Sequence, residues 1–316
     1  MTDTSDDDGP PPADPTPDGG DPVDAPPADT GYGTGDAESA DPDSVGTESV
    51  GPVDLGDTAD DDSPAVAVVV AVGLGVLGPA IALVGGLGVS LLGAVAGGVS
   101  LAVNIVLTLI VGQYVAFGGL AVGYLAWRGF DRAGIVSYLG VRRPSLKELG
   151  LVVGGWVVIV VTLFVVSAIV QLLGTETASN QSAEVAMQNP AIIPLFIVAM
   201  FLVVGPSEEI LYRGVVQGRL RESLPAAPAI AIASGIFALI HVMALTGGLS
   251  GRLTTVGILF FPSLVFGAVY EYTDNLIVPA LLHGLHNAVL FTILYVSIVY
   301  GEELQQVAEG GAAVLW

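Results

Sequence analysis

The chain has 316 residues, of which 52% are hydrophobic and 13% are charged, and it contains no cysteine. This composition is too apolar for an ordinary soluble domain, and the lack of cysteine excludes disulfides, thiolate catalysis and cysteine metal sites. The net charge of -22 is unevenly divided, because residues 1–63 hold 19 of the 31 acidic residues and none of the nine basic ones. The sequence therefore predicts an acidic tail joined to a nearly neutral membrane domain.

Residues 1–63 are rich in Asp, Pro, Gly, Ser and Thr, and Tyr32 is their only aromatic residue. Such a segment cannot bury enough apolar surface to offset the entropy lost on ordering, so we expect a disordered acidic tail. It lacks a basic region followed by an apolar core, which argues against a secretory signal. Solvation is the simplest role for this tail, and docking is the alternative.

No charged residue occurs between Ala65 and Trp127. Because about 20 apolar residues span a bilayer, this block predicts two membrane helices, near 66–91 and 101–127, or three shorter ones. We assign 64–130 to these N-terminal transmembrane helices. The run Gly73–Gly78 matches a dinucleotide-binding fingerprint by its letters, but it does not follow a strand. We therefore expect its small residues to allow close helix packing.

A short basic loop follows, and it holds five of the nine basic residues: Arg128, Arg132, Arg142, Arg143 and Lys147. The positive-inside rule places this loop, and with it the N-terminus of a seven-helix chain, in the cytoplasm. The polar connection 174–190 has no basic residue, so we expect it on the outer side. The later spans are expected at about 149–173, from Pro190 to Arg221, and at about 229–246, 254–270 and 276–299. Pro225 and Pro228 are expected to break the helix that precedes them.

The predicted fold is all-α: a polytopic membrane helix bundle of about seven transmembrane helices, with eight as the alternative if the first block holds three. We expect a multi-pass protein of the plasma membrane. Its last residues, 301–316, are predicted to form a short C-terminal tail.

Two adjacent carboxylates, Glu208 and Glu209, follow an apolar run from Val185 to Ser207 that contains no charged residue. Burying a carboxylate in hydrocarbon is costly, so an ionisable cluster there is a functional-site hypothesis. Glu209 and Arg213 share one helix face, whereas Glu208 points about 100° away. A structural ion pair is the plain alternative for Glu209 and Arg213.

All histidines of the chain lie in predicted spans: His241, His283 and His286. Phe237 lies about one helical turn before His241, and Asn287 about one turn after His283. At a rise of about 1.5 Å per residue, Glu208, His241 and His283 lie roughly 12 to 20 Å from the cytoplasmic ends of their helices. We therefore expect these three residues at a similar depth, in a cavity that opens towards the cytoplasm.

These residue types suit hydrolysis of an amide bond by water. A carboxylate beside a histidine can activate a water molecule as a general base, and a second histidine with an asparagine can donate hydrogen bonds to an oxyanion. An arginine can orient a carboxylate and keep it ionised. The chain contains neither G-x-S-x-G nor H-E-x-x-H, so serine hydrolase and zincin interpretations find no support.

Three motifs in order on separate predicted helices resemble those of the CPBP family, which comprises CAAX-prenyl-protease-like and bacteriocin-immunity-like (Abi) intramembrane proteases. They are Glu208-Glu209-x-x-x-Arg213, Phe237-x-x-x-His241 and His283-x-x-x-Asn287. The resemblance covers about 145–300, which we assign to a protease core; Tyr212 stands where family members often have phenylalanine. It implies an intramembrane endopeptidase that hydrolyses a peptide bond of a membrane-associated, prenylated or lipid-anchored protein.

The resemblance also implies roles. Glu208 with His241 would activate the hydrolytic water, and His283 with Asn287 would stabilise the oxyanion. The supporting residues would be Glu209, Arg213 and Phe237. His286 belongs to no motif, and we expect it to be a packing residue.

A metal is the open question for this site. If a zinc ion were present, its ligands would be Glu208, His241 and His283. No local spacing demands a metal, so we favour a mechanism without one.

Two alternatives to a protease remain. Buried carboxylates and histidines also form relays in transporters, although the chain shows no internal repeat. A non-catalytic immunity or scaffold protein is the other alternative. The expected partners are the lipid bilayer and a membrane-protein or lipid-anchored substrate, and no nucleic acid.

Overall fold

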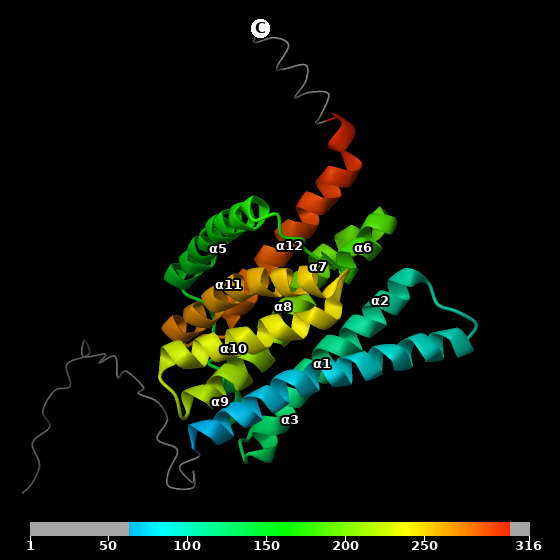
Figure 1. Ribbon diagram of the computed structural model, residues 1–316. Coiled ribbons are helices and arrows are strands. Elements are labelled where there is room, and N and C mark those ends of the chain that lie inside the picture. The colour runs from blue at the N-terminus through cyan, green and yellow to red at the C-terminus, as the bar shows by residue number, and fades with distance from the viewer. Residues whose placement is uncertain (1–62, 304–316) are drawn as a thin grey trace, which may run out of the picture. The chain divides into compact units, whose positions relative to one another are not determined.

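The computed structural model describes residues 63–303. Among these residues, seven helical segments are long and apolar enough to cross a membrane, so this is a multi-pass membrane protein with an all-α fold (Figure 1). The prediction of seven spans is confirmed, with two rather than three in the uncharged N-terminal block. The predicted acidic tail and most of the predicted C-terminal tail lie outside the described residues.

The first two spans form a helical hairpin. The first is α1 (Pro64–Val95), and the second joins α2 (Leu101–Leu109), the π-helical η1 (Ile110–Gly118) and α3 (Gly119–Trp127). Gly97 and Gly98 lie in the turn with φ of 87° and 96°, a backbone conformation that glycine adopts without steric cost. The side chain of Ser100 then accepts a hydrogen bond from the Val103 N–H and caps the start of the second span.

The basic loop contains the short helix α4 (Arg132–Tyr138) and leads into the third span, α5 (Leu146–Leu172). Ser145 and Glu148 form a capping box at the start of α5, which satisfies two N–H groups that the helix itself leaves unpaired. The connection after α5 holds β1 (Ser179–Asn180) and the short helix α6 (Gln181–Gln188).

The fourth span is continuous from Pro190 to Arg221 but changes its helical pitch. In order it contains η2 (Pro190–Ile192), α7 (Ile193–Ala199), η3 (Met200–Val204), α8 (Gly205–Glu209), η4 (Ile210–Gln217) and α9 (Gly218–Arg221). The π-helical segments η3 and η4 stand on either side of α8, the segment with both glutamates. π-Helical turns are rare and occur frequently at functional sites.

The last three spans are α10 (Ala226–Ile240) with the 3-10 turn η5 (His241–Ala244), α11 (Leu249–Thr273) and α12 (Ile277–Val299). Between the fifth and sixth spans, β2 (Leu245–Thr246) pairs antiparallel with β1. Pro225 is the N-cap residue of α10, which agrees with the helix break that was predicted at this proline. Pro228 does not break a helix. It lies in the first turn of α10, where a backbone N–H group would have no intrahelical hydrogen-bond partner.

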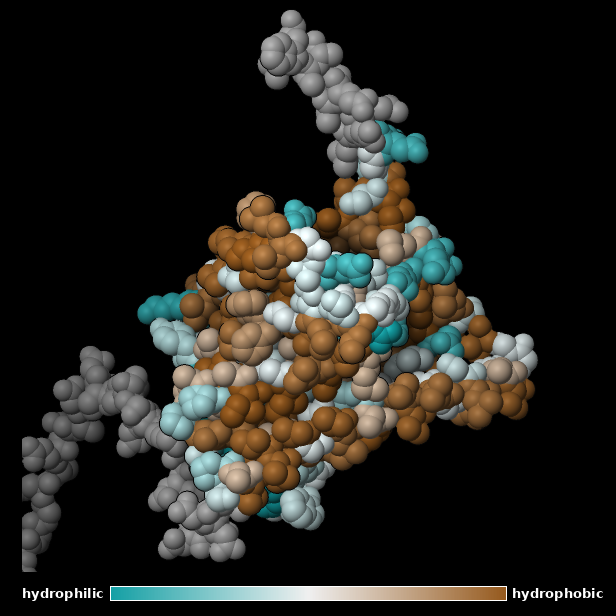
Figure 2. Space-filling view, in the orientation of Figure 1, coloured by the Kyte–Doolittle hydropathy of each residue, from teal (hydrophilic) through white to brown (hydrophobic). Residues whose placement is uncertain are grey.

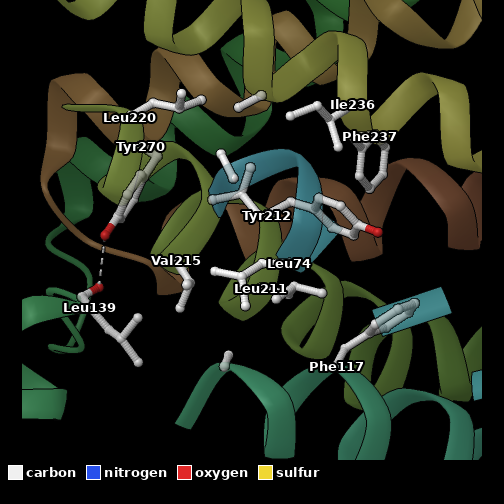
Figure 3. Close-up of a cluster of buried hydrophobic side chains, with 14 of the residues drawn as sticks. Leu74, Phe117, Leu139, Leu211, Tyr212, Val215, Leu220, Ile236, Phe237 and Tyr270 are labelled. Atoms are coloured by element: carbon white, nitrogen blue, oxygen red, sulfur yellow. Dashed lines mark hydrogen bonds between the residues drawn. The ribbon is translucent and has the colours of Figure 1, made fainter. Parts of the chain in front are cut away.

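The N-terminal hairpin packs against the rest of the bundle through a shared apolar cluster. In Figure 1, α10 and α11 run side by side, and α1 lies against α10 and η4. Figure 3 shows the cluster and labels among its members Leu74, Phe117, Leu211, Tyr212, Ile236 and Phe237. The Tyr212 hydroxyl donates to the Gly75 carbonyl at 3.0 Å, so the departure from phenylalanine supplies a hydrogen bond between the first and fourth spans.

Small residues of the Gly73–Gly78 run permit this packing. A Cβ added at Gly75 would lie 2.4 Å from Ile236 Cγ2, and one at Gly78 would lie 2.6 Å from Leu211 Cδ2. Both distances are far below van der Waals contact, so a larger residue at either position would force the neighbouring side chain to shift. The prediction of close helix packing here is confirmed.

A polar cluster joins the ends of the second and fourth spans. Glu222 accepts hydrogen bonds from Arg128 (2.5 Å), Tyr138 (2.9 Å) and Arg219 (2.8 Å). Burial, together with the neighbouring Glu222 carboxylate, raises the pKa of the Tyr138 phenol well above its ordinary value. Tyr138 therefore stays a neutral donor to Glu222 through the neutral pH range.

The outer faces of the spans are apolar. Figure 2 shows broad hydrophobic areas over the helices, and the exposed side chains include Val84 of α1 and Phe164 of α5. In water such surfaces would promote association, whereas lipid tails solvate them.

Candidate active site

The glutamates are buried at the centre of the fourth span. Glu208 is 8% exposed and Glu209 is fully buried. Glu209 Oε1 accepts a hydrogen bond from Arg213 Nη1 at 3.1 Å and lies 2.8 Å from Nδ1 of His283 on α12. The predicted pairing of Glu209 with Arg213 is therefore present, and the histidine is a second partner that helical spacing alone did not reveal.

Arg213 is held on all sides. Its Nη2 donates to the carbonyl oxygen of Ser263 at 3.0 Å and to the Ser263 hydroxyl at 2.8 Å. Its guanidinium carbon lies 4.5 Å from the ring centre of Phe237 and 5.2 Å from that of Phe266. Charge pairing, hydrogen bonds and cation–π contacts together offset the cost of burying this cation.

The close approach of the fourth and seventh spans brings Glu209 to His283. A Cβ added at Gly205 would lie 2.8 Å from the Ala280 carbonyl oxygen and 3.1 Å from the Gly284 nitrogen. A Cβ at Gly284 would in turn lie 3.0 Å from the ring of Phe201. The two glycines let the helix backbones come close, which places the Glu209 carboxylate within hydrogen-bond distance of the His283 imidazole.

His283 is oriented by the Glu209 contact. An ionised carboxylate can only accept, so Nδ1 carries the proton of this hydrogen bond. The other ring nitrogen, Nε2, lies 3.9 Å from Glu208 Oε2. Phe266 stacks on the ring at a centroid distance of 4.8 Å and keeps it in this plane. His283 thus connects the two glutamates, with one ring nitrogen towards each.

His241 stands where α10 ends and η5 begins. Its Nδ1 lies 2.7 Å from the Phe237 carbonyl oxygen, which can only accept, so Nδ1 is the donor. In the neutral ring the lone pair is then on Nε2, which is left free to accept a proton or a hydrogen bond. The ring of Phe237 lies 4.6 Å away between centroids and packs beside the imidazole, as predicted.

One cavity collects the predicted catalytic residues. It has a volume of about 480 Å³ and is lined by all four: Glu208, His241, His283 and Asn287. Phe237 lines it as well, whereas Glu209 and Arg213 lie behind its wall. His286, expected to be a packing residue, also lines the cavity although it is largely buried.

The cavity extends away from the basic loop. Its lining runs from the level of Glu208 to Ala178, Ala183 and Leu294, at the end that carries the connection 174–190. On the side of Glu208 that faces the basic loop, all residues of the fourth span from Leu211 to Gln217 are buried by helix packing. The expectation of a cavity that opens on the basic-loop side is therefore wrong, because packed helices separate Glu208 from that side of the bundle.

Two further residues at the site were missed by sequence reasoning. Gln113 of η1 donates to Glu208 Oε1 at 3.1 Å, and the Ser207 hydroxyl donates to Gln113 Oε1 at 2.8 Å. The available signal was weak: Asn104 and Gln113 are the only amide side chains between Ala65 and Trp127.

Glu208, His241 and His283 are the ligands expected if a zinc ion were present. Among residues 63–303, no group of three or more His, Cys, Asp or Glu side chains is arranged to hold a metal ion.

The fold and the site define a polytopic membrane protein with buried glutamates and histidines around one cavity. A family model described as Type II CAAX prenyl endopeptidase Rce1-like matches residues 190–289, a range that contains all three motifs. The match confirms the resemblance to CAAX-protease-like membrane proteases that those motifs carry. No curated protein and no solved structure matches the chain.

Proposed function

We propose that this protein is an intramembrane endopeptidase that cleaves a membrane-associated protein with a glutamate-activated water. The observation that carries the proposal is the convergence of Glu208, His241, His283 and Asn287, from three spans, on one cavity inside an apolar bundle. The match to a CAAX endopeptidase family over the same residues supports the reaction class.

In the proposed first step, Glu208 takes a proton from a water molecule that His241 Nε2 orients by accepting its other hydrogen. The water oxygen attacks the carbonyl carbon of the substrate, and the carbonyl electron pair moves onto its oxygen. His283 and Asn287 then donate hydrogen bonds to this oxyanion. The oxyanion then re-forms the C=O bond while the C–N bond breaks, and Glu208 gives the proton to the leaving nitrogen, which completes hydrolysis.

The oxyanion role sets a requirement for His283. Its Nδ1 already donates to Glu209, so Nε2 can donate to the oxyanion only if the ring carries both protons. With a protonated His283, the buried set holds two cations and two carboxylates: Arg213, His283, Glu208 and Glu209. The set is then neutral overall, which suits a site in a low-dielectric bundle.

The rest of the cavity favours an apolar substrate. Its lining includes Phe196, Met200, Leu290, Phe291 and Leu294. A transmembrane segment or a lipid-anchored peptide could bury apolar groups against these side chains, with the scissile bond beside Glu208. We propose membrane-anchored and prenylated proteins as the substrate class.

The test compares two matched glutamate substitutions in purified protein. Glu208→Gln keeps the size of the side chain but removes the base, so we expect cleavage of lipidated and transmembrane peptides to fall by roughly 10² or more. Glu271→Gln is the control, because Glu271 pairs with Arg221 at the end of the bundle, away from the cavity. Equal cleavage by wild type and Glu208→Gln would contradict the proposed function.

A further inference from the structure

The two oxygens of Glu208 have different partners. Oε2 faces His283 Nε2 at 3.9 Å, whereas Oε1 accepts a hydrogen bond from Gln113 Nε2 at 3.1 Å. Gln113 belongs to the second span, which lies outside the residues 190–289 that match the family model. A side chain from the N-terminal hairpin is therefore bound directly to the glutamate of the proposed reaction.

Gln113 is held at both ends of its amide. Its Oε1 accepts from the hydroxyl of Ser207, which is fully buried and precedes Glu208 in the chain. An amide is planar, so contacts at both of its polar atoms define its orientation. The Gln113 amide thus contacts two consecutive residues of α8, and Ser207 helps to set how Gln113 faces Glu208.

The same contacts suit both protonation states of Glu208. While Glu208 is ionised, it accepts from the Gln113 NH₂ group, and Gln113 Oε1 accepts from Ser207. When Glu208 takes a proton from the water onto Oε2, Oε1 remains an acceptor, so the Gln113 NH₂ group can continue to donate to it. The Ser207 hydroxyl also has the Val203 carbonyl oxygen within hydrogen-bond distance, at 2.6 Å. Each state leaves these groups hydrogen-bonded.

We propose that Gln113 is a positioning residue that holds Glu208 Oε1 and directs Oε2 towards the substrate in both protonation states of Glu208. This inference rests on the proposed function. It makes the N-terminal hairpin part of the catalytic apparatus, although that hairpin lies outside the predicted protease core 145–300.

The test is Gln113→Met, which keeps the length of the side chain but removes both polar atoms. We expect kcat to fall by about 10-fold to 100-fold, the cost of a misplaced catalytic group. Gln113 itself lines the cavity, so KM separates the two roles: a residue that acts through Glu208 leaves KM within about twofold, whereas a substrate contact raises it. Asn104→Leu is the control, since it removes the other amide of the second span and Asn104 does not line the cavity; it should leave kcat unchanged.

Ser207→Ala is the second variant and decides the question if Gln113→Met does not fold. It removes only the hydroxyl that orients Gln113, so kcat should fall with KM unchanged. A wild-type kcat in a folded Gln113→Met protein, or in Ser207→Ala if the former does not fold, overturns the inference. A rise of KM with kcat unchanged overturns it too, since it would indicate a substrate contact.

The two proposals fail in different ways. If wild type and Glu208→Gln cleave equally, the proposed function is wrong. If Glu208→Gln is inactive while Gln113→Met retains the wild-type kcat, only the role of Gln113 is wrong.

Discussion

At the scale of single residues, the two adjacent glutamates have the same side chain but different surroundings. Glu209 is enclosed by Arg213 and His283, whereas Glu208 lines the cavity and contacts Gln113. Consecutive residues of a helix are rotated by about 100°, so Glu209 points towards the packed interior and Glu208 towards the cavity. We therefore propose Glu209 as the structural carboxylate of the pair and Glu208 as the one with access to a substrate.

This difference predicts that two matched substitutions change the stability by different amounts. Glu209→Gln leaves the Arg213 charge buried without its closest counterion, so we expect the free energy of unfolding to fall by about 3 kcal/mol. Glu208→Gln should change it far less, because the cavity can solvate that side chain. Unfolding in mixed micelles of increasing denaturing detergent measures both. Equal losses of stability would contradict the assignment of separate roles.

At the scale of elements, glycines determine how closely the helices approach. Gly75 faces Ile236 of α10 and Tyr212 of η4, whereas a Cβ added at Gly73 would meet no atom within 4 Å. The two glycines lie on the same helix, two residues apart, so helix propensity treats them alike. Only packing against the fourth and fifth spans distinguishes them.

We therefore predict that Gly75→Ala is destabilising and Gly73→Ala is not. The added methyl group at position 75 would overlap Ile236, and overpacking of this kind costs about 1–3 kcal/mol. At position 73 the gain in helix propensity should make the change neutral or slightly stabilising. Thermal unfolding of the two variants in the same detergent measures the difference. A Gly75→Ala protein as stable as Gly73→Ala would show that the first span does not pack here.

At the scale of the whole bundle, the cavity extends towards the paired segments β1 and β2 and the helix α6. Ala178 and Ala183 line it at that end, and Glu184 of α6 accepts a hydrogen bond from Thr246 of β2. The short elements of the connection 174–190 thus border the space above Glu208. If substrates reach Glu208 through this space, the connection controls their entry.

Narrowing this end of the cavity should impair cleavage. We expect Ala183→Trp to lower kcat/KM by raising KM, because the larger side chain takes up space beside the substrate. Gln188→Trp is the matched control on the same helix, since Gln188 is exposed and does not line the cavity. Steady-state kinetics with a lipidated peptide measures both variants. Unchanged kinetics in Ala183→Trp would rule out entry past α6.

The sequence by itself determined the all-α membrane fold, a bundle of seven or eight spans and the three motifs. Bilayer thickness sets the length of each apolar run, and helical spacing of four residues places Glu209 beside Arg213 and Phe237 beside His241; all of these are local relations. Only the tertiary structure decided that Glu209 meets His283, that Gln113 binds Glu208 and that the cavity extends away from the basic loop. These depend on how each helix is rotated and how closely it packs, which the glycine contacts and the π-helical turns set together. The contact between Gln113 and Glu208 joins residues 95 positions apart, so no local pattern could have shown it.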